Sequence, residues 1–228
     1  STRSDPGDRA DFRLDVDSGW ELSPSLIASI EELCDQVEDA TSDVAVVLRL
    51  GGKTGAGGGP GDVGIHLVNK WERALRRLER LAAVTVAVAE GQCAGVALEV
   101  LLSCDYRVGT PDVRLALPLA AGELWPGMVV HRLANQLGVA KARELVLFGS
   151  GITGERALGL GLLDELTDDV EGAVEARSAL ARGVAGTELA IRRRLLMDAT
   201  TTSFEDALGT HLAACDRTLR RANKEAAR

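Results

Sequence analysis

Residues 84–105, VTVAVAEGQCAGVALEVLLSCD, constrain the fold of this chain more than any other stretch. They open with an apolar, β-branched run over residues 84–89, which is typical of a strand covered on both faces. Glu90-Gly91 is then expected to form a tight turn. Gly95 follows, where the missing side chain lets the backbone come close to another group. The stretch therefore predicts a buried strand, a turn and a helix that starts near Gly95.

Glu99 lies on this predicted helix, which is apolar on every other face except at Ser103. A helix that is apolar all round is a buried helix. A carboxylate on such a helix has to be paired, protonated or turned toward a cavity. One interpretation is a structural ion pair with an Arg elsewhere. The interpretation we favour is a general acid/base whose pKa is raised by burial.

Composition limits the class of protein. The chain has 228 residues, which fits one large domain, and 46% of them are hydrophobic but only 3% aromatic, so its core is mostly Ala, Val and Leu. The net charge of −8 argues against general nucleic-acid binding. The chain begins with polar residues and holds no apolar run of ~20 residues, so we expect a cytoplasmic protein without signal peptide or membrane span. Its four cysteines form no CxxC pair, which favours buried thiols.

The order of elements along the chain predicts an α/β core with parallel strands, because strands and helices alternate first and helices dominate later. We expect residues 1–10 to be disordered, residues 11–166 to form the core and residues 167–228 to form a helical, oligomerising region. The basic run at residues 192–194 is expected to be a solvated face. The expected strands are residues 11–17, 44–50, 84–89, 104–108, 113–117 and 162–166. The expected helices begin at Ser23-Pro24 and at residues 63, 95, 128, 139, 153 and 170. Residues 118–126 are expected to form a loop.

A glycine-rich stretch, GGKTGAGGGPGD, occupies residues 51–62. It contains Gly52-Lys53-Thr54, but a phosphate-binding Walker A loop needs a further glycine where Val47 stands, so that interpretation fails. Six of residues 51–60 are glycine. This composition predicts a loop that is mobile without ligand and that presents a bare backbone N–H group at its end.

Residues 84–166 resemble the crotonase superfamily, the enoyl-CoA hydratase/isomerase fold. The resemblance implies a crotonase-like ββα spiral core with a helical C-terminal part, and self-association into a trimer or hexamer. It is carried by residues 84–91, Gly95, Glu99, Cys104-Asp105, Pro118, Pro126-Gly127, Gly138, Ala140, Ala142, Glu144-Leu145, Ile152, Ala157 and Gly161-Leu162.

The resemblance also implies a chemistry. Two backbone N–H groups would bind the carbonyl oxygen of an acyl-CoA thioester and stabilise the enolate that forms on it. The resemblance assigns this oxyanion hole to Val96 and Gly61, with Gly95 and Leu119 beside the substrate and Glu99 as the acid/base. The CoA thioester is the substrate, and no cofactor or metal is implied.

Departures from the family pattern narrow the prediction. The family turn usually carries three glycines, where this chain has Gly95-Val96-Ala97. The second catalytic Glu of the family follows Pro118, where this chain has Leu119, so ordinary hydration is in doubt. Glu123 is either a replacement carboxylate or a surface residue.

These departures, with the glycine-rich loop, the short C-terminus and the acidic charge, are similar to family members that assist a type III polyketide synthase. The resemblance implies dehydration or aromatisation of a polyketide CoA thioester to 3,5-dihydroxyphenylacetyl-CoA, on the route to dihydroxyphenylglycine and glycopeptide antibiotics. The expected partners are then the synthase and other crotonases of the pathway.

Two alternatives stay open. Because Leu119 replaces a catalytic residue, the chain could be a non-catalytic crotonase-fold partner of the synthase. Alternatively, residues 91–95, GQCAG, fit a nucleophile elbow with Cys93 as the nucleophile of a hydrolase. That chemistry needs a His base, and the candidates are His66, His131 and His211.

Overall fold

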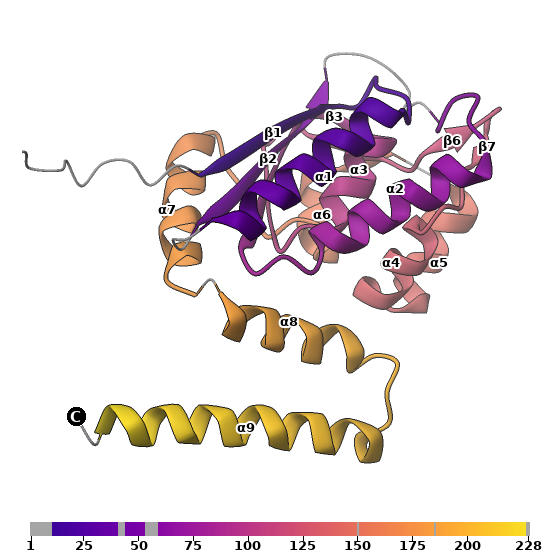
Figure 1. The fold of residues 1–228 in the computed structure, drawn as a ribbon. Coiled ribbons are helices and arrows are strands. Elements are labelled where there is room, and N and C mark those ends of the chain that lie inside the picture. Colours follow the sequence, from indigo (N-terminus) through magenta and orange to yellow (C-terminus); the bar gives the residue numbers. More distant parts are fainter. Residues whose placement is uncertain (1–10, 41–43, 53–58, 150, 185, 227–228) are drawn as a thin grey trace, which may run out of the picture.

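A mostly parallel sheet runs through the centre of the computed structural model, which describes residues 11–40, 44–52, 59–149, 151–184 and 186–226 (Figure 1). The neighbouring strands of its main path are all parallel. In spatial order they are β1 (Phe12–Asp17), β2 (Ala45–Gly52), β3 (Val84–Ala94), β4 (Tyr106–Gly109) and β9 (Glu165–Leu166). The predicted α/β core with parallel strands is confirmed.

The predicted turn at Glu90-Gly91 is wrong, because β3 bends there without ending. Gly91 has φ +58, and a Cβ on it would lie 2.9 Å from the carbonyl oxygen of Gly52. Before the bend, β3 pairs with β2 and β4. After it, residues 92–94 pair with β5 (Arg114–Ala116), which also pairs antiparallel with β8 (Ile152–Thr153). A glycine thus lets one strand serve two parts of the sheet.

Helices α1 (Pro24–Asp39) and α2 (Ile65–Leu78) lie side by side against one face of the sheet (Figure 1). The side chain of Ser23 accepts a hydrogen bond from the N–H of Leu26, so this residue caps α1 as predicted. Helix α7 (Val170–Arg182) packs on the opposite face, where Val170 and Val174 meet Val47 and Val88. Both faces of the central strands are therefore covered, which explains their continuous apolar run.

The segment predicted as a loop at residues 118–126 contains a small hairpin of β6 (Leu119–Ala120) and β7 (Glu123–Leu124). Its two turn residues, Ala121 and Gly122, have φ +52 and +83. Positive φ at both positions gives the turn a twist that matches the flanking strands. Strands of two residues are too short to show an alternating pattern, so the sequence did not reveal them.

The second half of the chain is mainly helical, as expected. Thr153 caps α6 by accepting from the N–H of Arg156, as predicted. Helices α8 and α9 extend away from the sheet (Figure 1). The bounds are α3 (Val96–Leu102), α4 (Val129–Leu137), α5 (Val139–Phe148), α6 (Gly154–Leu160), α8 (Thr187–Asp198) and α9 (Phe204–Ala226).

The basic run at residues 192–194 is not simply a solvated face. Arg193 is buried, and its guanidinium group donates to both carboxylate oxygens of Asp105, at 3.0 and 2.5 Å. It also donates to the backbone carbonyls of Leu81 and Ala83. This one side chain therefore ties α8 to the N-terminal end of β3.

Three predictions about the organisation of the chain stay predictions. Residues 1–10 lie outside the described residues, and so do residues 53–58 of the loop predicted to be mobile over residues 51–60, of which Gly51 and Gly52 belong to β2. The division of the chain at residue 166 stays a prediction, and α7, beyond it, packs on the sheet. Among the helices that the structure describes, none is long and apolar enough to cross a membrane.

Candidate active site

The bend of β3 leads directly into the candidate site. The strand ends at Ala94, Gly95 adopts φ +55 and ψ −130, and α3 begins at Val96. This abrupt change of direction needs a glycine, because residues with a side chain rarely adopt such a φ. The first N–H groups of a helix have no partner within it, so the N–H of Val96 is available to an acceptor in front of α3.

Glu99 is located one turn further along α3 and is 3% exposed. Its Oε2 atom accepts a 2.6 Å hydrogen bond from the indole Nε1 of Trp71 on α2. Its Oε1 atom is buried and has no hydrogen-bond partner among the described residues. No described Arg or Lys forms an ion pair with it. The structural ion-pair interpretation is therefore not supported, and one carboxylate oxygen is left for a ligand.

Burial raises the pKa of Glu99 from its ordinary value of 4.5 to about 7. The hydrogen bond from Trp71 opposes this rise because it stabilises the carboxylate. The charge of Glu72 raises the pKa further, and that of Arg132 lowers it. A carboxyl group with a pKa near neutrality can both accept and donate a proton at physiological pH.

A small cleft brings several segments together around Glu99. They include the end of the glycine-rich loop, α2, the start of α3 and the residues on either side of the hairpin. The space between them measures about 260 Å³, open solvent included. Its lining consists of Leu22, Gly59, Pro60, Val68, Trp71, Gly95, Val96, Glu99, Pro118 and Trp125. The loop and the helix N-terminus that were expected to face one ligand therefore share one cleft.

The remaining predicted site residues lie around this cleft. Gly61 follows Pro60 but does not line the cleft; it has φ +77, and a Cβ on it would lie 2.7 Å from Oε2 of Glu21. Leu119 is 39% exposed and follows the lining residue Pro118. Glu123 is exposed on β7 and outside the lining. Gly95, Val96 and Glu99 thus line the cleft, and the roles of all six predicted site residues stay predictions.

Sequence reasoning missed the residues that surround Glu99 from other elements. Trp71 belongs to the apolar face of α2 with Ala74, Leu75 and Leu78, and a Trp on a buried face usually donates its N–H to a partner. Arg132 is buried on α4 beside Leu133. An Arg on an apolar face signals a buried acidic partner, but the sequence does not reveal which one.

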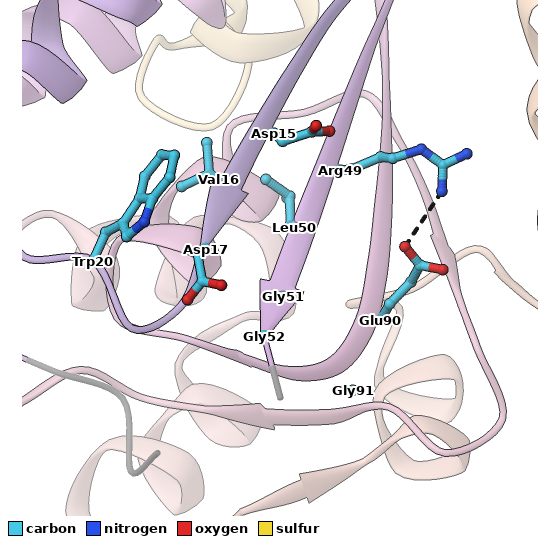
Figure 2. Close-up of a pocket in the computed structure, with 10 residues that line it drawn as sticks. All are labelled: Asp15, Val16, Asp17, Trp20, Arg49, Leu50, Gly51, Gly52, Glu90 and Gly91. Atoms are coloured by element: carbon cyan, nitrogen blue, oxygen red, sulfur yellow. Dashed lines mark hydrogen bonds and ion pairs between the residues drawn. The ribbon is translucent and has the colours of Figure 1, made fainter. Parts of the chain in front are cut away.

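A second, larger cleft lies at the ends of β1 and β2, next to the bend of β3, with about 890 Å³ of space, open solvent included. Figure 2 shows its lining: Asp15, Val16, Asp17, Trp20, Arg49, Leu50, Gly51, Gly52, Glu90 and Gly91. Arg49 is paired with Glu90 at 3.3 Å and also with Glu171. The lining is therefore acidic overall, which does not suit the phosphates of a CoA molecule.

The cysteine-hydrolase alternative finds no support in this geometry. Cys93 is fully buried within β3, and burial raises the pKa of its thiol well above the ordinary value. A reactive cysteine needs the thiolate form and solvent access. The candidate bases His66, His131 and His211 are all exposed.

A sheet bent at Gly91, a helix N-terminus at Gly95 and a buried carboxylate one turn later define a crotonase-type protein. The family model described as enoyl-CoA hydratase/isomerase matches residues 30–227. A protein named enoyl-CoA-hydratase from Amycolatopsis orientalis is 45% identical over 208 residues, covering 91% of this chain and 95% of that protein. The chain therefore belongs to the enoyl-CoA hydratase/isomerase family.

Solved structures share the fold at low sequence identity. An enoyl-CoA hydratase from Mycobacterium smegmatis is similar with a TM-score of 0.77 at 18% identity, covering 91% of this chain and 87% of the other. An enoyl-CoA hydrotase/isomerase family protein from Silicibacter pomeroyi reaches 0.76 at 17% identity, covering 92% and 96%. These similarities confirm the predicted crotonase fold.

Proposed function

We propose that this protein acts on a polyketide acyl-CoA thioester and assists a type III polyketide synthase in forming 3,5-dihydroxyphenylacetyl-CoA, on the route to dihydroxyphenylglycine. Membership of the enoyl-CoA hydratase/isomerase family supports acyl-CoA chemistry. The observation that carries the proposal is the unpartnered Oε1 atom of Glu99, buried beside the N-terminus of α3. We also propose, from the resemblance, a cytoplasmic homo-oligomer, a trimer or hexamer, that works beside the synthase and other crotonases.

The proposed reaction is an elimination of water that uses one carboxyl group. The N–H groups of Val96 and Gly61 hold the thioester oxygen, and ionised Glu99 takes a proton from the neighbouring carbon. The C–H electron pair then forms an enolate, whose negative charge lies on the held oxygen. When the enolate collapses, a C=C bond forms and the hydroxyl on the β carbon leaves as water, with the proton that Glu99 returns.

A single carboxyl group suffices for this sequence because it gives back the proton that it took. With a pKa of about 7, Glu99 is present in both forms near neutral pH. Hydration by two carboxyl groups fits less well, because Leu119 cannot transfer a proton and Glu123 is exposed outside the cleft. Loss of water toward an aromatic ring is also favourable in itself.

A second candidate function is a non-catalytic partner of the synthase. Leu119 at the position of the second family carboxylate favours it, as does the small size of the cleft. The two functions differ in whether Glu99 is needed, because binding to a synthase does not depend on a buried carboxyl group.

The test adds purified protein to the synthase and malonyl-CoA and measures product formation. We expect Glu99→Gln to fold, to bind CoA thioester and to lose at least ~100-fold of the stimulation, since it cannot titrate. Full stimulation by this variant would instead establish the binding-partner function. Glu123→Gln is the matched variant: it removes the same charge outside the cleft, and a comparable loss there would assign Glu123 a catalytic part.

A further inference from the structure

Glu72 and Glu99 approach the same point from two elements. Gly127, with φ +39, lies between them, and a Cβ on it would be 3.2 Å from Oε1 of Glu99 and 3.5 Å from Oε1 of Glu72. The indole Nε1 of Trp125 would be 3.1 Å from the same Cβ. The bare Cα of Gly127 thus leaves space that the two carboxyl groups share. At such separations the charge of one group acts on the proton of the other.

Glu72 is held in place on both of its oxygens. Oε1 accepts from the N–H of Met128 at 3.0 Å, and Oε2 accepts from Nη1 of Arg132 at 2.9 Å. Arg132 is buried and also donates to Oε1 of Glu79 at 2.7 Å. Glu79 also pairs with Arg76, whose Nη1 atom lies 3.0 Å from its Oε2 atom, so two guanidinium groups face the two carboxylates. Arg132 does not cancel the effect of Glu72 on Glu99, because the charge of Glu72 still raises the pKa of Glu99.

We propose that Glu72 is a positioning residue for proton transfer at Glu99: its fixed negative charge makes ionised Glu99 a stronger base and holds the proton that Glu99 takes from the substrate until Glu99 returns it. The inference rests on the proposed function, in which Glu99 moves the proton. Burial is the main cause of the raised pKa of Glu99, and the charge of Glu72 adds to it while Trp71 and Arg132 oppose it. Glu72 is not among the residues that carry the family resemblance, so no local sequence pattern marks it.

Other titratable groups on the neighbouring segments are weaker candidates for this role. The buried thiols of Cys93 and Cys104 stay protonated, because burial raises the pKa of both. The glycine-rich loop contributes exposed Asp62, and Glu21 lies beside Gly61. Neither carboxylate contributes to the raised pKa of Glu99. Among the described residues, Glu72 and Arg132 are the charged groups that do.

The test reads the titration of Glu99 without any enzyme activity. Trp71 donates to Glu99, so its fluorescence changes when Glu99 ionises. The pH titration of the wild type minus that of Glu99→Gln isolates this change from the other tryptophans. We expect a midpoint near 7, and we expect Glu72→Gln to lower it by roughly one pH unit. Arg132→Gln should raise the midpoint, because it removes the cation and leaves Glu72 unneutralised.

Two controls separate charge from loosened packing. Glu123→Gln removes an equal charge outside the cleft and should leave the midpoint unchanged. Glu79→Gln weakens the hold on Arg132 but keeps the charge of Glu72, and it should not lower the midpoint as Glu72→Gln does. Shifts of the same sign for Glu72→Gln and Arg132→Gln, or an unchanged midpoint in Glu72→Gln, would overturn the proposal.

A measurement on the wild-type protein tests the proposal even if a variant does not fold. In wild-type protein labelled with ¹³C at glutamate carboxyl groups, the Glu72 resonance should show an inflection at the Glu99 midpoint. If the chemical shift of the Glu72 carboxyl carbon shows no inflection at the Glu99 midpoint, the inference is contradicted. Because none of these measurements uses substrate, they can succeed even if the polyketide function is wrong.

Discussion

At the scale of single residues, the proposed chemistry centres on one buried carboxyl group. Glu99 has one oxygen bonded to Trp71 and one without a partner, and its pKa is raised to about 7. A buried polar atom without a partner is costly, and such atoms in native proteins commonly mark a functional site. The same burial makes a prediction about stability.

Glu99 should make the stability of the folded protein depend on pH. Its pKa is about 7 when folded and near 4.5 when unfolded, so the folded state binds the extra proton between these values. Its contribution is therefore fully present below about pH 4.5, is lost as pH rises and is gone above about pH 7. Glu99→Gln has no charge to bury, so it should gain about 3 kcal/mol relative to wild type between pH 4.5 and 8.

Urea unfolding of both proteins across this pH range measures the effect. The difference between the two free energies of unfolding cancels the other titrating groups, which are common to both. A difference that is constant with pH would show that Glu99 keeps an ordinary pKa in the folded state.

At the scale of elements, the site depends on the loop end meeting the hairpin. Gly59 lies so close to β6 that a Cβ on it would be 2.2 Å from the carbonyl oxygen of Leu119. Its neighbour Pro60 lines the cleft, and Gly61 follows. Small backbone shifts here move the expected oxyanion donor relative to Glu99.

We therefore expect Gly59→Ala to push the loop end away from β6 and to reduce product formation by roughly 10- to 100-fold, since misplacement of about 1 Å can cost this much. Hydrogen exchange with a CoA thioester should show protection of residues 59–62 and 95–104 in wild type and less in the variant. Gly151→Ala, whose Cβ meets nothing within 4 Å, is the matched control. Protection of some other surface, with both segments unchanged, would mean that the acyl-CoA site is misplaced.

At the scale of the whole molecule, α9 lies apart from the sheet (Figure 1) and carries exposed apolar residues. Phe204, Leu208, Leu212 and Leu219 are all exposed. Their spacing places them on one side of the helix. Contiguous exposed apolar residues usually mark an interaction site, which agrees with the self-association expected from the resemblance.

We expect light scattering to give a mass that is a multiple of 24.0 kDa, three or six chains. Leu212→Glu should shift the protein toward the monomer, because a charge cannot be buried unpaired in an apolar contact. Thr210→Glu, on the opposite side of α9, should leave the mass unchanged. A monomeric wild type would contradict the prediction, and so would an unchanged mass for Leu212→Glu.

The sequence by itself determined the features that depend on neighbouring residues. The apolar run at residues 84–89 predicted a strand covered on both faces, Ser23 and Thr153 predicted helix caps, and the apolar surroundings of Glu99 predicted its burial. Each of these follows from local periodicity or from short-range hydrogen bonding, which the sequence displays directly.

Only the tertiary structure decided which groups surround Glu99. Trp71 is 28 positions from Glu99, to which it donates a hydrogen bond. Arg132 is 60 positions from Glu72, whose carboxylate it holds in place. Arg193 is buried because Asp105 lies 88 positions away in the chain but beside it in space. Local patterns carry no information about such partners, since contacts between distant segments form only when whole elements pack together. The sequence therefore identified the carboxyl group, and the fold set its pKa and left one of its oxygens unpartnered.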